Sequence, residues 1–313
     1  MEFKHKPVLL NECIEGLNIK PDGIYVDGTL GGAGHSKEIL KRLDKNKGIL
    51  IGIDRDEEAL QAAKQNLSEY ENVKYVHGNH DNIKEILESL KIDKVDGILL
   101  DLGVSSYQLD ERNRGFSYLG SNELDMRMDK SQRLTAMEVV NNYKEEHLAN
   151  IIYEYGEERF SRNIARNICI ERRKKKIETT DELVKIIEKS IPRLNPKEGH
   201  PAKRTFQAIR IEVNNEIKPL EDTIKNSIDV LKQGGRLCVI TFHSLEDRAV
   251  KQAMNRAKGM CTCPKDIPYC VCGAKELGTV ITRKPIIASE EEQRENSRSK
   301  SAKLRIFERR FSD

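Results

Sequence analysis

The stretch of sequence DGTLGGAGH, from Asp27 to His35, decides the fold. A short apolar run, Ile24 to Val26, comes before it and predicts a strand, and Ser36 to Leu43 predicts a helix after it. Glycines between a strand and a helix let the backbone approach a ligand closely. The stretch therefore predicts a ligand-binding loop at the end of a strand.

Outward from this loop, strand and helix patterns alternate over the first hundred residues. Apolar runs predict strands over Gly48–Ile53, Val73–Val76 and Gly97–Leu100, with helices over Glu57–Leu67 and Asn82–Leu90 between them. Nearly continuous apolar strands separated by helices are typical of a parallel sheet covered on both faces. The expected fold class is α/β, with a Rossmann-like doubly wound sheet.

The alternation stops after about residue 109, and residues 110–201 show no strand pattern. Two capping-box patterns, at Thr135 and at Thr179, predict helix starts. A helix over Lys144–Tyr155 is expected to stop at Gly156. We expect an inserted helical, substrate-binding domain over 110–201, between a first part of the sheet domain at 1–109 and a second part at 202–313.

The sheet pattern resumes in the last third of the chain. Pro219 opens a helix that should end at Gly234-Gly235, and Arg236–His243 predicts a fifth strand. Val280–Ile287 and Leu304–Phe311 predict a closing hairpin, with a polar loop over Ser289–Ser301 between the two strands.

Composition argues for a cytoplasmic protein. The chain has 54 basic and 51 acidic residues, a net charge of +3 that does not by itself imply nucleic acid. No apolar run approaches the roughly 18 residues that a membrane span needs, and residues 1–10 lack a signal-peptide pattern. Of the seven cysteines, Cys13, Cys169 and Cys238 lie in apolar contexts typical of a core.

Asp54 indicates which ligand the glycine loop takes. It ends the second strand, where a carboxylate can accept hydrogen bonds from both ribose hydroxyls of an adenosine. A dinucleotide-binding G-x-G-x-x-G pattern begun at Gly32 would need a third glycine at position 37, which is Lys37. A sulfonium cation is also stabilised by carboxylates such as Asp27 and Asp101. S-adenosylmethionine is therefore favoured over a dinucleotide.

The run Asp101-Leu102-Gly103-Val104-Ser105-Ser106 follows the fourth strand. In a doubly wound methyltransferase this position lies beside the reactive methyl group. The lone pair of a nucleobase amine is delocalised into the ring, and a carboxylate that accepts its N–H bonds favours the reactive form. Asp101 is therefore our candidate catalytic residue for methylation of an amine.

His243, after the fifth strand, should lie at the same sheet edge as Asp101. Ser244 and Asp247 after it have a capping-box pattern that predicts the start of a helix. A Ser–His hydrolase is disfavoured because the chain has no G-x-S-x-G elbow.

With these motifs in place, the sequence resembles the bacterial 16S ribosomal RNA cytosine-N4 methyltransferase family nearly from end to end. The matching pieces are HKPVLLNE at His5, DGTLGGAGHS at Asp27, IGIDRD at Ile51, DGILLDLGVSSYQLD at Asp96, RGFSY at Arg114, LDMRMD at Leu124, YGEERFSRNIARNI at Tyr155, TFQAIRIEVNNE at Thr205, GGRLCVITFHSLEDRAVK at Gly234 and NSRSKSAKLR at Asn296.

The resemblance implies S-adenosylmethionine-dependent methylation of a cytosine amine in 16S ribosomal RNA or the small ribosomal subunit. With the loop glycines, the implied cofactor contacts are Gly31, Gly32, Ala33, Gly34, His35, Asp54, His80, Asp101 and Gln108. Relatives often carry Phe at position 80. The resemblance also implies that the helical insertion binds RNA. A basic run from Arg159 to Lys176 in this insertion suits contacts with phosphates. The candidate RNA-binding residues are His243, Arg162, Arg166, Arg172, Arg173 and Lys174.

The four remaining cysteines form the cysteine cluster, Cys261, Cys263, Cys270 and Cys272. Two C-x-C pairs so close together can surround one structural Zn²⁺ tetrahedrally. Reduced free thiols and redox pairing are the alternatives, and disulfides are disfavoured in the cytosol.

Two rival functions stay open on the sequence alone. A DNA amine methyltransferase would carry two prolines and an aromatic residue after Asp101, where this chain has Leu102-Gly103-Val104. A nucleotide-binding ribosome-assembly factor without turnover is the other.

Overall fold

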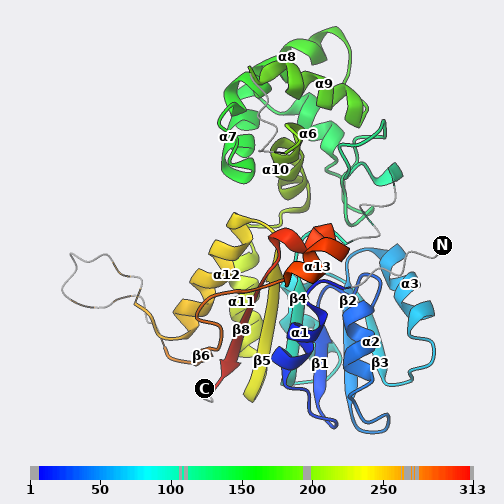
Figure 1. Cartoon of the computed structure of the whole chain (residues 1–313), viewed down its shortest axis with the longest axis vertical. Coiled ribbons are helices and arrows are strands. Elements are labelled where there is room, and N and C mark those ends of the chain that lie inside the picture. The colour runs from blue at the N-terminus through cyan, green and yellow to red at the C-terminus, as the bar shows by residue number, and fades with distance from the viewer. Residues whose placement is uncertain are drawn as a thin grey trace. The chain divides into compact units, whose positions relative to one another are not determined.

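A computed structural model describes residues 7–105, 108, 112–192, 199–261, 263, 269, 271 and 275–310. The chain forms two compact units, the first made of 1–103 with 217–313 and the second of 104–216. Figure 1 shows the first unit in colours from both ends of the bar, because the chain enters it twice. We describe each unit by itself.

The first unit is an α/β fold built on an eight-stranded sheet, which confirms the predicted fold class. The strand order is β3-β2-β1-β4-β5-β8-β6, with β7 also paired to β8. Strands β1 to β5 are parallel, and β8 runs antiparallel to its neighbours. The strands are β1 (Ile24–Asp27), β2 (Ile49–Asp54), β3 (Val73–His77), β4 (Val95–Asp101), β5 (Leu231–Thr241), β6 (Gly278–Val280), β7 (Ile286–Ile287) and β8 (Lys303–Arg309).

Helices cover both faces of this sheet, because successive strand residues point to opposite sides. Tyr25, Leu50 and Leu99 pack with α1, α2 and α3, whereas Val26, Ile51 and Ile98 pack with α4, α11 and α12. The helices of this unit are α1 (Leu10–Leu17), α2 (Gly34–Leu40), α3 (Glu57–Asn66), η1 (His80–Asn82), α4 (Ile83–Ser89), α11 (Leu220–Asp229), α12 (Ser244–Ala257), α13 (Glu290–Glu295) and η4 (Ser297–Ser301).

The strand order reverses direction between β1 and β4. In open α/β sheets ligands bind outside the carboxyl ends of the strands at such a switch point. The chain leaves β1 at Asp27 and β4 at Asp101, and these ends lie on adjacent strands. The topology therefore places the glycine loop and Asp101 at one edge.

The second unit is helical and has its own core. Its elements are η2 (Arg112–Arg114), α6 (Ala136–Asn142), α7 (Glu145–Gly156), α8 (Ser161–Lys174), α9 (Thr180–Ser190) and α10 (Ala202–Asn214). Both capping boxes predicted in this region, at Thr135 and at Thr179, are present. The unit extends beyond the expected 110–201, because Phe206, Ile209 and Val213 of α10 pack in the same core as α7 and α8.

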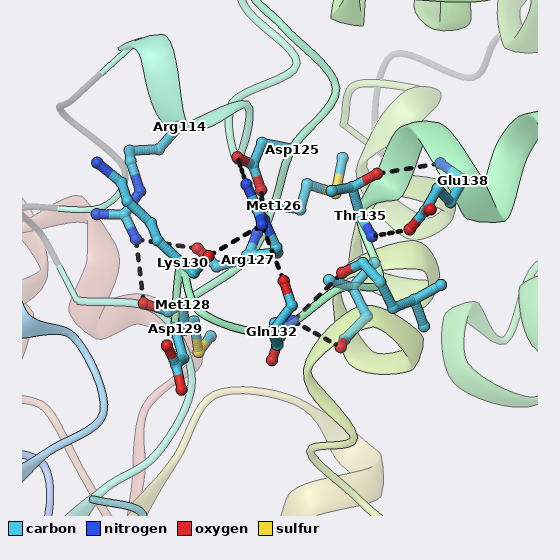
Figure 2. A network of polar contacts seen from close by, with 12 residues as sticks. Arg114, Asp125, Met126, Arg127, Met128, Asp129, Lys130, Gln132, Thr135 and Glu138 are labelled. Atoms are coloured by element: carbon cyan, nitrogen blue, oxygen red, sulfur yellow. Dashed lines mark hydrogen bonds and ion pairs between the residues drawn. The ribbon is translucent and has the colours of Figure 1, made fainter. Parts of the chain in front are cut away.

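A polar network fixes the loop between η2 and α6 (Figure 2). The Arg127 guanidinium donates to both carboxylate oxygens of Asp125 and to the carbonyls of Lys130 and Gln132. Arg114 donates to the carbonyls of Arg127 and Met128. These two arginines hold the loop through hydrogen bonds to its carbonyls and to Asp125.

Several local predictions were wrong. Gly156 does not stop α7 but is its last residue, and Glu157 takes the left-handed cap position. A Cβ added to Gly156 would lie 2.7 Å from the Arg204 carbonyl oxygen. Strand β5 begins before Gly234-Gly235, which form a bulge in it. The single strand expected over Val280–Ile287 is two strands, β6 and β7, since Pro285 cannot donate to a ladder.

The expected polar loop over Ser289–Ser301 was also wrong, because it holds α13 and η4. Ser289 caps α13 by accepting from the Glu292 N–H, and three glutamates fill its first turn. None of the helices in the described ranges is long and apolar enough to cross a membrane.

Candidate functional site

The glycine loop is braced from within by Asp27, the last residue of β1. Ser36 Oγ donates to one carboxylate oxygen at 2.7 Å, and the Thr29 N–H donates to the other at 3.2 Å. Burial raises the pKa of this carboxyl, while the hydrogen bonds from Ser36 and Thr29 lower it. Asp27 is 2% exposed, so its direct task is to hold the loop.

The loop backbone needs residues that tolerate left-handed conformations and close approach. Gly31 has φ 48° and Ala33 has φ 63°, just before α2 begins at Gly34. An added Cβ on Gly32 would meet no atom of the described chain within 4 Å, so this backbone faces open space. A Cβ on Gly34 would lie 2.3 Å from Pro7 Cγ. Gly34 is therefore required for packing, whereas Gly32 is exposed.

Asp54 ties the end of β2 to this loop. The Gly31 N–H donates to its Oδ2 at 2.8 Å, and the Asp56 N–H donates to its Oδ1 at 2.9 Å. Burial raises the pKa of Asp54 to about 6, despite these two bonds. Each carboxylate oxygen has a further lone pair, so the group can still accept two hydroxyl hydrogen bonds.

His80 follows β3 in η1 at the same edge. Its side chain is 14% exposed, and burial lowers its pKa to about 4. The ring is therefore neutral at pH 7. A Cβ added to Gly28 would lie 3.1 Å from the Cβ of His80. His80 therefore lies directly beside the end of β1. A neutral ring at this point suits stacking on an adenine.

Asp101 ends β4 and is fixed through its backbone. Its N–H donates to Thr29 Oγ1 at 2.6 Å, so the glycine loop and the end of β4 are joined. Its Oδ1 is buried and has no hydrogen-bond partner in the described part of the chain. Burial raises the pKa of Asp101 to about 6, and the charges of Asp27 and Glu246 add to this. A buried oxygen of this kind has an acceptor position left for a donor from a ligand.

His35, on the first turn of α2, faces Asp101. Its Nδ1 lies 3.9 Å from Asp101 Oδ2, and its Nε2 lies 3.0 Å from the Val8 carbonyl. The side chain is only 7% exposed. The structure thus brings six of the predicted cofactor residues of the first unit, five in the loop and at the start of α2 and the sixth at Asp54, to one sheet edge together with His80 and Asp101.

His243 follows β5 at this same edge, as expected from the parallel pairing of β4 with β5. The predicted capping box at Ser244 was wrong by one residue, because His243 is the cap and Glu246 completes the box. His243 has the extended φ of −141° that a cap requires, and its Nδ1 accepts from the Glu246 N–H. Its Nε2 lies 3.1 Å from Glu246 Oε1.

Gln108 and the basic run belong to the second unit. Gln108 is buried, and its Oε1 accepts the Ser105 N–H at 3.1 Å. In α8, Arg172 donates to the Val140 carbonyl and Lys174 pairs with Glu171. The other predicted RNA-binding residues of this helix, Arg162, Arg166 and Arg173, are exposed.

The cysteine cluster is described only in part, because Cys270 and Cys272 lie outside the described residues. Cys261 is exposed and Cys263 is half-buried. The Cys263 N–H donates to Cys261 Sγ at 3.4 Å, and the Val271 N–H donates to Cys263 Sγ at 3.2 Å. The predicted core positions of Cys13, Cys169 and Cys238 are confirmed, since all three are buried.

Sequence reasoning missed four residues that build the site: Thr29, Ser36, Glu246 and Pro7. Thr29 lies within the quoted stretch and Ser36 directly follows it. The Thr29 backbone N–H and the Ser36 hydroxyl both donate to the Asp27 carboxylate, and a backbone N–H two positions after an aspartate is a common partner of that carboxylate. Pro7 gave no such signal, because its contact with Gly34 depends on the tertiary fold.

The chain matches known proteins over its whole length. Residues 2–310 match the model of the MraW methylase family. A Clostridium botulinum protein named ribosomal RNA small subunit methyltransferase H is 60% identical over 306 residues, 98% of this chain and 99% of that one. A protein of the same name from Lachnospira eligens is 58% identical, covering 99% of this chain and 98% of the relative.

Among solved structures, an rRNA methylase from Streptococcus thermophilus covers 99% of both chains at 12% identity and a TM-score of 0.44. The family assignment rests on the sequence matches. With a family model matched from residue 2 to residue 310 and relatives about as long as itself, the chain belongs to the MraW methylase family.

Proposed function

We propose that this protein transfers a methyl group from S-adenosylmethionine to the exocyclic N4 amine of a cytosine in 16S ribosomal RNA. It is an S-adenosylmethionine-dependent methyltransferase by family, and its curated relatives are named for small-subunit ribosomal RNA. The observation that carries the amine as acceptor is Asp101, whose buried Oδ1 lacks a partner in the described chain at the switch point of the sheet.

The residues of the edge fit S-adenosylmethionine. Asp54 has lone pairs left for the two ribose hydroxyls, and the bare backbone at Gly32 admits the methionine end. The neutral ring of His80 can lie against the adenine. When bound, S-adenosylmethionine supplies an electrophilic methyl group on a sulfonium cation. The carboxylates of Asp27 and Asp101 make this edge favourable for a positive charge.

Asp101 acts on the amine. Its free Oδ1 can accept an N–H bond and turn the nitrogen lone pair out of conjugation with the ring. The Thr29 hydroxyl holds the Asp101 backbone, so the carboxylate is oriented before the substrate arrives. Orientation of this kind supplies a large part of the rate of a displacement reaction.

The second unit is the proposed RNA surface. Arg162 and Arg166 are one turn apart on α8 and exposed, which suits contacts with successive phosphates. Gln108 is proposed to complete the cofactor site and His243 to contact the RNA. The proposed substrate also implies the cytoplasmic location and the small ribosomal subunit as partner.

One structural Zn²⁺ in the cysteine cluster is part of the proposal. Its support is the pattern of four cysteines within twelve positions, since the described residues include two of the four. Sulfur ligands at this spacing select zinc over harder metals.

Methyl transfer from radiolabelled S-adenosylmethionine tests the proposal. Immature small subunits, naked ribosomal RNA and DNA are offered in parallel, and nucleoside analysis identifies the product. We expect N4-methylcytidine in small-subunit RNA. Label in DNA would identify a DNA amine methyltransferase, and cofactor binding with no transfer to any acceptor would identify an assembly factor. Either result overturns the proposal.

A further inference from the structure

The ring of His35 has a defined tautomer. Its Nε2 lies 3.0 Å from the Val8 carbonyl, and a carbonyl oxygen can only accept. Nε2 therefore carries the hydrogen, and in the neutral ring Nδ1 carries a lone pair. That lone pair faces Asp101 Oδ2 at 3.9 Å.

This orientation is imposed from outside α2. The Leu9 N–H donates to Glu292 Oε1 of α13 at 2.8 Å, which fixes the chain next to the Val8 carbonyl. Pro7 lies against Gly34, the residue before His35. Two segments far apart in sequence thus hold an imidazole that is 7% exposed, with its bare nitrogen turned to a carboxylate.

Asp101 Oδ2 and His35 Nδ1 are two hydrogen-bond acceptors that face each other, and one proton can be shared between them. An ionised Asp101 and the bare Nδ1 both lack a hydrogen, and Asp101 Oδ1 has no partner within the described residues. Besides His35, the titratable groups that interact with Asp101 are Asp27, Glu246 and the buried Cys13 thiol. Burial raises the pKa of Asp101 most, a charge on His35 would lower it, and the charges of Asp27 and Glu246 raise it further. The net direction is upward, which favours uptake of a proton.

We propose that Asp101 and His35 form a pair that takes up the proton lost by the methylated amine, with His35 as the positioning residue. The inference rests on the proposed function. As the new N–C bond forms and the methyl–sulfur bond breaks, the amine nitrogen becomes cationic. It loses one proton to the Asp101 carboxylate, and the resulting O–H is directed at His35 Nδ1. The proton later leaves to water.

The distance of 3.9 Å is longer than a hydrogen bond. One water molecule or a small side-chain rotation joins the two groups, and catalytic hydrogen bonds are often long before the substrate binds. The pair has no proton in its active form. It therefore gains a proton, and loses activity, as the pH falls through the apparent pKa of the pair.

His35→Gln separates the two functions of the ring. A glutamine amide can still donate to the Val8 carbonyl from the place of Nε2, but it has no acceptor at the place of Nδ1. We expect the single-turnover rate at pH 8 to fall about 10- to 100-fold. The acid limb of the pH–rate profile should move to lower pH. Without Nδ1 to accept its O–H, protonated Asp101 is less stable, so its apparent pKa falls. A merely structural role would leave this limb where it is.

His77→Gln is the matched control. The His77 ring also lies against a carbonyl, that of Arg55 at 3.1 Å, but it is exposed at the end of β3. This variant should keep the rate and pH profile of the parent. If His35→Gln also keeps both while the parent methylates RNA, the inference is overturned and the proposed function stands.

Nitrogen-15 NMR of the histidine rings gives a readout that needs neither activity nor a folded His35 variant. In the parent protein at pH 8, the His35 ring should show a protonated Nε2 and a bare Nδ1. Its signals are assigned by elimination, from Asn and Gln substitutions of the other histidines. Asp101→Asn should shift the Nδ1 signal, because the new amide donates to it. A protonated Nδ1 in the parent, or no shift in the variant, would refute the pair.

Discussion

Replacing Asp54 tests whether this carboxylate holds the ribose of S-adenosylmethionine. Within the described residues it accepts two backbone N–H groups, from Gly31 and Asp56, so a lone pair on each oxygen is left for a hydroxyl. A hydrogen bond to a charged group contributes about 1.5–3 kcal/mol. Loss of about 3 kcal/mol in Asp54→Ala raises the dissociation constant about 150-fold, at 1.4 kcal/mol per tenfold.

The pH dependence of affinity provides a second measurement. Burial raises the pKa of Asp54 to about 6, and hydroxyl donors prefer the ionised form. Affinity is therefore full well above pH 6 and is lost as the pH falls through 6. At pH 5 about a tenth of the molecules are ionised at Asp54, so the apparent dissociation constant should be about tenfold higher than at pH 8.

Isothermal titration calorimetry between pH 5 and pH 8 measures both effects. Because the pKa of Asp101 is also raised to about 6, Asp101→Asn serves as the control that removes its share of the pH dependence. Asp54→Asn keeps the shape of the side chain and should bind weakly at every pH. Parent-like affinity in Asp54→Ala, or a tenfold pH effect that survives in Asp54→Asn, would remove the ribose contact from Asp54.

Three further outcomes are expected. Asp101→Asn should reduce single-turnover methyl transfer far more than it weakens cofactor binding. The pKa of Asp101 is raised to about 6, so ionising it lowers the free energy of unfolding of the cofactor-free parent as the pH rises from about 4 through 6. The variant should therefore be more stable than this parent at pH 8, by up to about 3 kcal/mol in thermal unfolding, with no difference below pH 4. The cysteine cluster should yield one zinc per chain by elemental analysis of tag-free protein grown with zinc, and zinc-free protein with four titratable thiols would contradict it. Arg162→Gln with Arg166→Gln should weaken binding of small-subunit RNA and reduce its salt slope by roughly one to two, whereas Lys45→Gln with Lys47→Gln, exposed between α2 and β2, should leave both unchanged; equal effects would show a solvated face rather than an RNA surface.

The positions of the strand-ending aspartates could be predicted because strands of a parallel sheet are long apolar runs. Asp27, Asp54 and Asp101 each interrupt such a run, and the edge where they meet follows from the strand order alone. What these carboxylates contact could not be predicted. The hydrogen bond from the Gly31 N–H to Asp54 depends on a φ of 48° at Gly31, and the spacing of residues in the sequence does not specify this angle.

The errors share a cause, which is that tertiary contacts decide between local alternatives. His243 caps α12 although serine is the commoner cap, because Glu246 closes the box on it. The helix α13 has no buried residue and therefore no apolar periodicity to find. Residues 202–216 were expected in the second part of the sheet domain, and the packing of α10 with α7 shows that they belong to the second unit.

The interrupted first unit has a consequence for how the chain is made. Strands β4 and β5 are neighbours in the sheet, but residues 104–216 are synthesised between them. At about 5–20 residues per second the ribosome needs roughly ten seconds to pass from the end of β4 to the start of β5. During that time the helical unit, which is continuous and has its own core, can fold while β4 exposes an unpaired edge. Nascent chains should therefore bind chaperones through β4 until β5 emerges.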